Sequence, residues 1–461
     1  MKKSIRLLIC IALSAIILTA VFAVCASAED ATPISTAEDF EKIVGGKEYY
    51  LTQDIDFAGK EYTDYIVANF FGKIDGKGHA IYNFKIVTSG TSDAGIIQRA
   101  CRYIDENKAE KTGNLEIVDL NIGKEDLPAV LTGTMTANSK SIGMLAGSIN
   151  SGPSLNLDNV NLYYDINIDG DVKVNIGGVV GYSRTFIFTN CKTYGKIQNG
   201  GGINSVYTTY HNAGGYIGSG NADAQFIECE NHAEIITYCS TKEARAAGFV
   251  AYSASSIYFD FCVNYGNVTV YDSADQKADG YAAGFIAHAN KASGFLLEDC
   301  YNCGDVTASN YCSGFAANVN KGCMFENCKN YGLNNKDAIK YGAFYASTDD
   351  ETGIEEVDCV DAPGQTPVIE RTTDPADDDT DSSTPVESKT ETASETTKET
   401  EKEPASESRS ETQKTPNESK TEPNSNPTDD NKGCKSSVVG IIPAMIVTLL
   451  GSALIKKKIE D

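Results

Sequence analysis

Eleven cysteines, an odd number, lie from residue 101 to residue 359, and they are the most conspicuous candidates for chemistry in this sequence. The densest group is Cys300, Cys303, Cys312, Cys323 and Cys328. Exported proteins usually oxidise their thiols, so local disulfides are one interpretation, with Cys323 joined to Cys328 or to Cys312. Zinc is a second, but it needs four converging ligands, and no histidine lies near this group in the sequence. Regular recurrence favours a third interpretation, because a free cysteine packs as a small hydrophobe inside a stack of repeats.

Asp54, Asp56 and Asp75 are the acidic residues that we weigh for calcium binding or acid–base chemistry. Calcium requires several oxygens converging on one point. These aspartates instead stand at predicted strand ends and in a glycine-rich turn, where Asp accepts hydrogen bonds from backbone amides. Turn chemistry is the preferred interpretation, and no cofactor is predicted except Ca²⁺ as an alternative. His79, in the same Asp-Gly-Lys-Gly-His segment, is expected to be structural.

No motif in the sequence assigns a reaction. The chain has no G-x-S-x-G and no H-E-x-x-H motif. It also shows no recognisable carboxylate pair of a glycosidase and no basic residue beside a calcium site, as a lyase would need. We therefore predict no catalytic residue, while noting that active sites on stacked coils assemble from residues one coil apart. Tyr194, Tyr265 and Tyr331 recur in register, which predicts a structural ladder rather than a sugar-stacking platform.

Five repeats organise the middle of the chain. Each has a glycine-led apolar strand, such as the one at residues 248–250, followed by a Cys-x-Asn-Tyr-Gly motif or a variant of it. The repeated cysteines, at intervals of 38, 33, 38 and 28 residues, are Cys191, Cys229, Cys262, Cys300 and Cys328. The glycine that closes the motif is present in four repeats as Gly195, Gly266, Gly304 and Gly332.

Units of this length are too short to fold alone, so each must stack on its neighbours. Runs of Val, Ile, Phe, Tyr and Thr between turns that accept left-handed geometry predict several strands per coil. We predict an all-β solenoid of parallel sheets with the cysteine position facing inward. A capping box at Ser35 and Thr36 predicts an N-terminal capping helix through Val44. Residues 341–360 lose the repeat pattern and are expected to close the other end.

The two ends of the chain predict export and a membrane anchor. Residues 1–28 have a basic start, an apolar run and a small-residue cleavage site, which is typical of a signal peptide. Residues 29–362 are expected to form the repeat body, and residues 363–434 a disordered stalk rich in Ser, Thr, Glu and Pro. Residues 435–461 contain an apolar stretch followed by three lysines, which predicts a transmembrane helix with a basic cytoplasmic tail. The body would then be extracellular, anchored in the plasma membrane.

The charge of the chain excludes one class of partner. The formal net charge is −25, and most of it lies in the body. An anionic surface repels phosphate backbones, so we expect no nucleic-acid partner. The same repulsion disfavours an acidic polysaccharide unless a cation bridges the two.

Beyond these properties, the chain resembles a known family. Residues 36–40, 50–57 and 71–81 are similar to the opening of right-handed parallel β-helix surface proteins, and the Gly-Phe-Val and Cys-x-Asn-Tyr-Gly-x-Val units resemble their GLUG-type repeats. The resemblance covers most of residues 29–359. It implies a pectate-lyase-like right-handed parallel β-helix on the surface of a Gram-positive anaerobic bacterium.

Proteins of this kind serve as adhesins, glycan-binding modules and spacers, and more distant β-helices are polysaccharide lyases. The resemblance therefore implies a non-catalytic surface adhesin or glycan-binding module whose ligand is a glycan or a host surface. A surface polysaccharide lyase or glycoside hydrolase is one alternative. A passive spacer or envelope structural protein is another.

Overall fold

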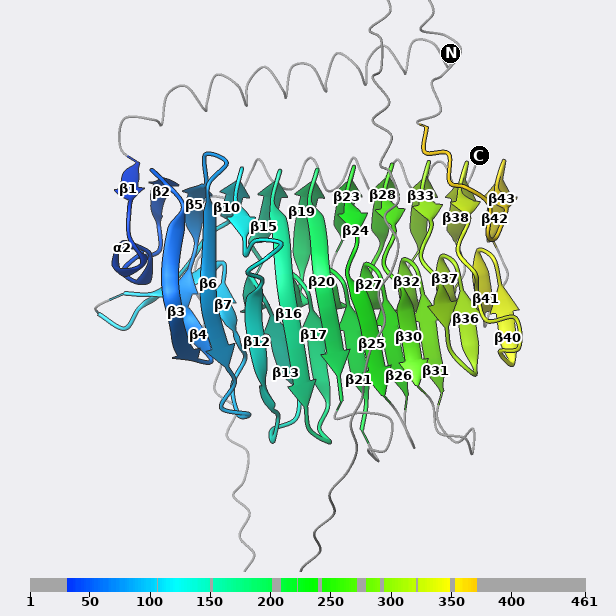
Figure 1. Ribbon diagram of the computed structural model, residues 1–461, viewed down its shortest axis with the longest axis horizontal. Helices are drawn as coiled ribbons and strands as arrows, with labels where there is room; N and C mark the ends of the chain where they lie inside the picture. Colours follow the sequence, from blue (N-terminus) through cyan, green and yellow to red (C-terminus); the bar gives the residue numbers. More distant parts are fainter. Residues whose placement is uncertain are drawn as a thin grey trace, which may run out of the picture. The chain divides into compact units, whose positions relative to one another are not determined.

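The computed structural model describes residues 31–370 except 106, 150–151, 201–208, 222, 239–242, 272–278, 291–293, 321 and 349–352. In this part of the chain, strands wind into coils that stack side by side as long parallel sheets (Figure 1). Each full coil passes through four sheets, which we name A, B, D and C in the order in which the chain visits them. The prediction of a nearly all-β fold with stacked parallel sheets is confirmed.

Sheets A and B contain most of the strands. The strands of sheet A are, in spatial order, β1 (Thr32–Ile34), β2 (Lys47–Leu51), β5 (Gly72–Asp75), β10 (Leu115–Val118), β15 (Ser154–Asp158), β19 (Thr185–Thr189), β23 (Ala224–Ile227), β28 (Ile257–Asp260), β33 (Phe295–Glu298), β38 (Cys323–Glu326) and β42 (Glu355–Val357). The strands of sheet B are, in chain order, β3 (Ile55–Thr63), β6 (Ala80–Val87), β11 (Asn121–Ile122), β12 (Ala129–Thr134), β16 (Asn161–Asp169), β20 (Lys192–Asn199), β24 (Glu230–Asn231), β25 (Glu234–Tyr238), β29 (Val263–Asn264), β30 (Val268–Tyr271), β34 (Tyr301–Asn302), β35 (Val306–Thr307), β39 (Lys329–Asn330) and β43 (Val360–Asp361).

Sheets D and C complete each coil. The strands of sheet D are β13 (Lys140–Gly143), β17 (Val174–Gly177), β21 (His211–Gly214), β26 (Ala244–Ala247), β31 (Gly280–Ala283), β36 (Tyr311–Ser313) and β40 (Lys340–Gly342). The strands of sheet C are β4 (Tyr65–Phe70), β7 (Gly95–Ala100), β14 (Ala146–Ser148), β18 (Val180–Ser183), β22 (Ile217–Gly220), β27 (Val250–Ser253), β32 (Ile286–Ala289), β37 (Ala316–Val319) and β41 (Tyr345–Thr348). A separate antiparallel pair is formed by β8 (Arg102–Ile104) and β9 (Glu110–Thr112).

The register of the strands explains the repeat lengths. In sheet A, Phe186 pairs with Ala224, and Ala224 pairs with Ile257. These offsets of 38 and 33 residues equal the intervals between the first three repeated cysteines, so one repeat is one coil. Because parallel neighbours are in register, the side chains at one motif position form a row along the stack.

A residue with left-handed backbone geometry marks the corner between sheets A and B in eight successive coils. The residues at this corner, with φ between 49° and 54°, are Asp119, Asn159, Asn190, Glu228, Phe261, Asp299, Asn327 and Asp358. Six of them are Asn or Asp, which tolerate this geometry better than other non-glycine residues. The next residue in the chain is Leu120, Val160 or one of six cysteines, and all but Cys359 are fully buried.

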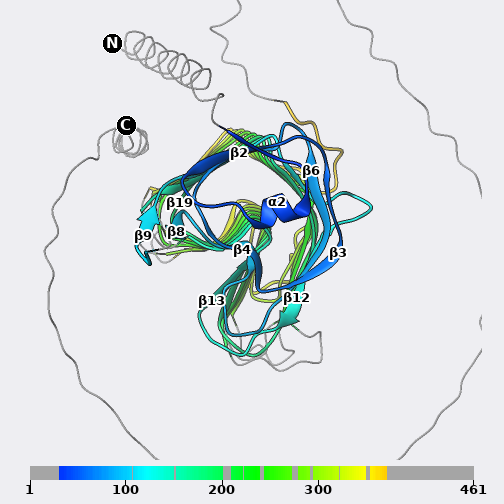
Figure 2. The same ribbon diagram turned by 90° about the vertical axis from the view of Figure 1, so that its left-hand side faces the viewer.

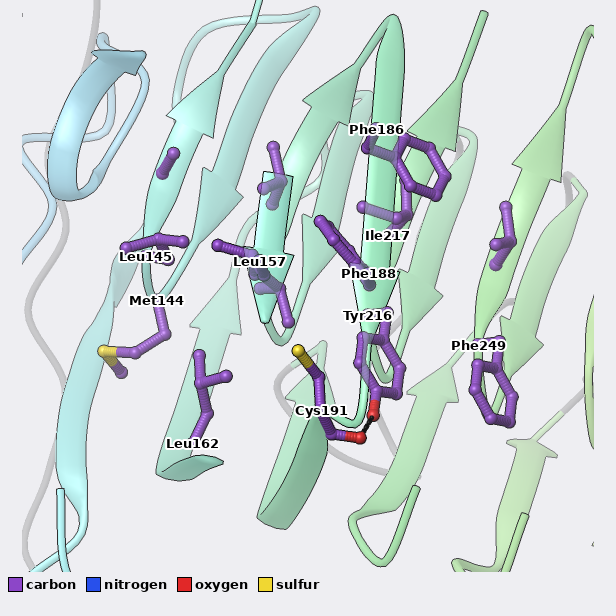
Figure 3. Packing of buried hydrophobic residues seen from close by; sticks show 14 of the residues in the cluster. Met144, Leu145, Leu157, Leu162, Phe186, Phe188, Cys191, Tyr216, Ile217 and Phe249 are labelled. Atoms are coloured by element: carbon purple, nitrogen blue, oxygen red, sulfur yellow. Dashed lines mark hydrogen bonds between the residues drawn. The ribbon is translucent and has the colours of Figure 1, made fainter. Parts of the chain in front are cut away.

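The core extends along the stack as one continuous cluster. Rings from neighbouring coils stack on each other, as Phe226 does on Phe259, with 4.8 Å between ring centroids. Figure 3 shows the packing near Cys191, where the hydroxyl of Tyr216 lies 2.5 Å from the Cys191 carbonyl. This hydrogen bond satisfies a fully buried hydroxyl, which would otherwise destabilise the core.

The N-terminal cap is shorter than predicted. The helix α2 (Ala37–Glu41) ends three residues before Val44, and its capping box begins at Thr36, with Asp39 rather than Glu38 as the third helical residue. The Thr36 hydroxyl accepts from the Asp39 amide, and the Asp39 carboxylate accepts from the Thr36 amide. Figure 2, which looks at this end of the stack, shows α2 across the opening of the first coil. Phe40 seals the core there by packing against Phe57.

Residues 341–360, which were expected to close the other end, lie at the C-terminal end of the stack. They form one further coil through β40, β41, β42 and β43, although the repeat motif is no longer recognisable. Phe344 continues the aromatic stack of the core by packing on Phe315, 5.3 Å away. Apolar side chains at the inward positions are thus sufficient for stacking without the motif.

Residues 363–370, which we assigned to the stalk, lie against the body. The Tyr331 hydroxyl is 3.4 Å from the Val368 carbonyl, and the Tyr301 hydroxyl hydrogen-bonds to the backbone of Glu370. Ile369 packs beside these tyrosines.

Within the ranges that the structure describes, no helix is long and apolar enough to cross a membrane. The predicted signal peptide, the rest of the stalk from residue 371 and the predicted transmembrane segment lie outside those ranges.

Candidate functional site

A polar groove of about 510 Å³ is formed where sheets D and C meet. In Figure 2, the labels β13 and β4 mark the first strands of these two sheets. Two rows of in-register side chains line the groove. The row from sheet D is Ser141, Asn175, Asn212 and Arg245, and the row from sheet C is Ser148, Tyr182, Ser219 and Tyr252.

A directional chain of hydrogen bonds links the sheet D row. The Glu243 carboxylate accepts from the Arg245 guanidinium at 2.6 Å, and Arg245 donates to the Asn212 side-chain oxygen at 3.3 Å. Asn212 in turn donates to the Asn175 oxygen at 2.8 Å. The chain therefore ends at the NH₂ group of Asn175, a hydrogen-bond donor in the groove lining.

Asp93 fixes the serines at the N-terminal end of the groove. One carboxylate oxygen accepts from the Ser141 amide at 3.0 Å, and the other accepts from the Ser148 hydroxyl at 2.9 Å. On the sheet C row, Asn221 donates to the Tyr182 hydroxyl at 2.9 Å. The contacts of the Ser148 and Tyr182 hydroxyls hold these two groups in defined orientations, and such preorganisation reduces the entropic cost of binding a ligand.

Aromatic and charged side chains gather at the other end of the groove. The Arg245 guanidinium lies 4.6 Å from the centre of the Tyr252 ring, within the range of a cation–π contact. His288 continues the sheet C row, and its Nδ1 is 3.4 Å from the Glu243 carboxylate. Tyr281 continues the sheet D row, and its ring edge meets His288, with 5.2 Å between ring centroids.

The described lining of the groove carries hydroxyl, amide and tyrosine groups. Its hydroxyl, amide and tyrosine groups match an elongated ligand that carries many hydroxyl groups, because each can donate or accept. Asp93 is the one carboxylate among the lining residues, and it already accepts two hydrogen bonds. The described lining residues therefore include no pair of carboxylates of the kind that glycosidases use.

The five repeated cysteines lie in the core and do not line the groove. All five are free thiols and fully buried, and each Sγ lies within hydrogen-bonding distance of a backbone carbonyl, as Cys300 does at 3.3 Å from that of Glu298. Cys312 and Cys323 are also thiols that form no disulfide, and burial raises the pKa of Cys323 to about 12. In the described ranges, no group of three or more His, Cys, Asp or Glu is arranged to hold a metal ion.

The four repeated glycines allow neighbouring coils to approach closely. A Cβ atom at Gly195 or Gly266 would lie 1.9 Å from a backbone carbonyl oxygen of the preceding coil. At Gly304 and Gly332 the corresponding distances are 2.1 Å and 2.0 Å. These glycines are thus needed for stacking rather than for a reaction.

The row of asparagines inside the repeat motif was not singled out from the sequence. Asn231 donates to Asn264 at 2.7 Å, Asn264 to Asn302 at 2.8 Å, and Asn302 to Asn330 at 2.9 Å. Thr193 donates to the first member, and Asp361 accepts from the last. All four asparagines are fully buried. Their recurrence two residues after each cysteine was the available signal.

This asparagine ladder also explains the glycine that leads each apolar strand. A Cβ at Gly248, Gly284 or Gly314 would lie 2.2 to 2.4 Å from the side-chain oxygen of a ladder asparagine. The two halves of the repeat motif are therefore complementary parts of one packing arrangement.

Asp54, Asp56 and Asp75 do not converge on one point. Asp54 accepts from the Ala80 amide and pairs with Lys124, Asp56 accepts from the Ala58 amide, and Asp75 accepts from the Lys77 amide. His79 lies beside Asp54, with 3.3 Å between Nδ1 and the carboxylate. The lysine and the backbone amide lower the pKa of Asp54.

The repeated tyrosines form part of an aromatic row on the outer face of sheet B. Tyr163, Tyr194, His232 and Tyr265 stack in sequence with 4.6 to 4.7 Å between centroids. Tyr331 stands further along the row, beyond Cys303. Since each inner ring is covered on both faces by its neighbours, these rings present mainly their edges to a ligand. The hydrogen bond from His232 to Glu230, with help from Lys192, holds the pKa of Glu230 at about 2.

Neither a family model nor a curated protein sequence matches the chain. Among solved structures, the body is similar to a chain from Bacteroides ovatus described as a "putative immunoglobulin A1 protease". The two are 14% identical, the match covers 72% of this chain and 84% of that chain, and the TM-score is 0.41. The described part of this protein is, by its own sheet topology, a parallel β-solenoid.

Proposed function

We propose that this protein is a non-catalytic surface adhesin whose groove between sheets D and C binds an extended glycan. The observation that carries the proposal is the pair of in-register polar rows, with tyrosines in the sheet C row and a hydrogen-bond chain in the sheet D row. Sugars present hydroxyl groups at their edges and apolar C–H groups on their faces. Rows of Ser and Asn match the former, and Tyr182 and Tyr252 match the latter.

The setting of the groove is inferred from the sequence. A signal peptide at residues 1–28 and a transmembrane segment within residues 435–461 would place the body outside the cell on an acidic stalk. The Gly-Phe-Val and Cys-x-Asn-Tyr-Gly units support assignment to right-handed β-helix proteins with GLUG-type repeats. Anchor, stalk and stacked body all serve display of a binding surface.

The test is binding of the body, residues 29–370, to an array of neutral and acidic glycans. Tyr182→Ala removes a ring from the groove and is expected to weaken binding of any captured glycan about tenfold or more. Tyr271→Ala is the matched control, because Tyr271 is 39% exposed on sheet B and away from the groove. Its affinity is expected to equal that of the unmodified body.

Three outcomes would contradict the proposal. Equal loss in both variants would place the ligand elsewhere or indicate general destabilisation. Release of unsaturated or hydrolysed sugar products would indicate a lyase or a glycoside hydrolase. Absence of binding to every glycan on the array would favour a passive spacer or envelope protein.

A further inference from the structure

The buried cysteine row ends in a pair that differs from every other pair in it. The row runs through Cys191, Cys229, Cys262, Cys300, Cys328 and Cys359. The first five are fully buried, whereas Cys359 is partly exposed in the last described coil. The strand that follows Cys359, β43, pairs only with β39 among the described strands, so this edge of the stack has a neighbour on one side.

The two terminal thiols are already adjacent. Lys329 pairs with Val360, which places the preceding residues Cys328 and Cys359 side by side in neighbouring coils. The Val360 amide donates to the Cys328 carbonyl at 2.9 Å, which fixes this register next to the thiols. Neighbouring strands lie about 4.7 to 4.9 Å apart. That spacing falls within the Cα separation of about 4.4 to 6.8 Å found in disulfides.

A disulfide also needs the two Cβ atoms about 3.5 to 4.5 Å apart, so one strand must shift slightly toward the other. An inner cysteine such as Cys300 is held by coils on both sides, and its thiol is closed to reagents. Cys359 has freedom on its outer side and access to solvent. Thiol–disulfide exchange requires that access.

We propose that Cys328 and Cys359 form a disulfide that staples the last coil to the stack when the protein meets a small-molecule disulfide. The Cys359 thiolate attacks one sulfur of oxidised glutathione, the glutathione S–S bond breaks, and one glutathione thiolate leaves. Cys328 then gives up its proton and attacks the Cys359 sulfur. The second glutathione thiolate leaves, and the leaving thiolates take up the two protons. Two protein thiols are oxidised, and one glutathione disulfide is reduced.

The staple would act on the least supported strands of the body. β42 and β43 are edge strands, and the residues of β42 are all exposed. Unpaired edges open first in a stacked fold. A covalent link between Cys328 and Cys359 closes the chain segment that contains β40, β41 and β42, and so opposes this opening.

The experiment treats the full chain with oxidised glutathione, alkylates the remaining thiols after unfolding and identifies the peptides by mass spectrometry. We expect a linked peptide pair joining Cys328 to Cys359 and the loss of two alkylatable thiols at those positions. Hydrogen exchange of β42 and β43 should slow in the oxidised protein. In Cys328→Ser, the partner thiol is missing, so Cys359 should instead retain bound glutathione.

Cys303 is the internal control. It is partly exposed like Cys359, but its in-register neighbours are Tyr265 and Tyr331, so it should carry glutathione without forming a protein disulfide. A stable glutathione adduct at Cys359 in the unmodified protein would overturn the proposal. A link between Cys300 and Cys328, or no reaction at Cys359, would overturn it as well.

Discussion

His211 is a fully buried histidine in β21, and its burial makes the folded protein sensitive to acid. Its ring nitrogens contact the side chains of Asn199 at 3.2 Å and Thr209 at 3.4 Å. Burial lowers the pKa of His211 to about 4, from an ordinary value of 6.5. As the pH falls from 6.5 toward 4, the His211 side chain binds a proton in the unfolded chain but stays neutral in the folded chain. Stability must therefore fall with pH across this interval, by roughly 3 kcal/mol at most.

We expect His211→Gln to reduce this loss. Glutamine is neutral throughout, so between pH 7 and pH 5 the unmodified body should lose about 2 kcal/mol more stability than the variant. Urea unfolding of both proteins at the two pH values measures the difference. The carboxylates titrate in both proteins, and the comparison removes their contribution. Equal losses in the two proteins would show that His211 is protonated in the folded state at pH 5.

At the scale of the elements, the asparagine ladder joins the coils through buried hydrogen bonds. Asn264 donates to the Gly266 carbonyl at 2.9 Å and to Asn302 at 2.8 Å, and accepts from Asn231 at 2.7 Å. Asn264→Ala leaves a buried oxygen of Asn302 without its donor and frees one proton of Asn231. We expect a loss of about 2 to 4 kcal/mol in the free energy of unfolding, because buried polar groups without partners are destabilising.

The matched control is Asn107→Ala, because Asn107 is exposed in the turn between β8 and β9. Its effect should stay within about 0.5 kcal/mol. Urea titration of both variants gives the comparison. If Asn264→Ala costs no more than the control, the ladder is a consequence of stacking and not a source of stability.

Some elements of the fold could be predicted from the sequence, and others could not. The regular cysteines predicted one repeat per coil, because a row position in register must repeat with the coil. The helix through Val44 was too long, since the chain leaves helical geometry after Glu41, shortly before Gly45 and Gly46. The last coil lacks the repeat motif, yet Phe344 and Cys359 keep the inward positions there.

The groove could not be predicted in the same way. Its sheet D row contains Ser141, Asn175, Asn212 and Arg245, which are three different residue types at four positions. Neighbouring members are 34, 37 and 33 residues apart, so only the strand register brings them together. In a row of core side chains, packing restricts the residue type at each position, and this restriction appears as a regular pattern in the sequence. The residue types of the groove row differ from coil to coil, although Ser141, Asn175 and Asn212 are largely buried.

At the scale of the whole described body, a stack of coils distributes its stability along one direction. Each inner coil contacts a coil on either side, whereas the last coil contacts one. The stability of such a fold is close to a sum of coil terms and nearest-neighbour terms. A substitution in the middle of the stack therefore weakens two interfaces, and one at the end weakens a single interface and can be absorbed by local opening.

Phe259 and Phe344 test this difference. Phe259 is fully buried and packs on Phe226, Phe249 and Phe285, while Phe344 in the last coil packs on Phe315 and Phe325. We expect Phe259→Ala to cost about 3 to 5 kcal/mol and to raise hydrogen exchange in coils on both sides. Phe344→Ala should cost less, with faster exchange confined to β40, β41, β42 and β43. Uniform acceleration along the whole stack in Phe344→Ala would mean that the body unfolds as one cooperative unit, and that its last coil does not open alone.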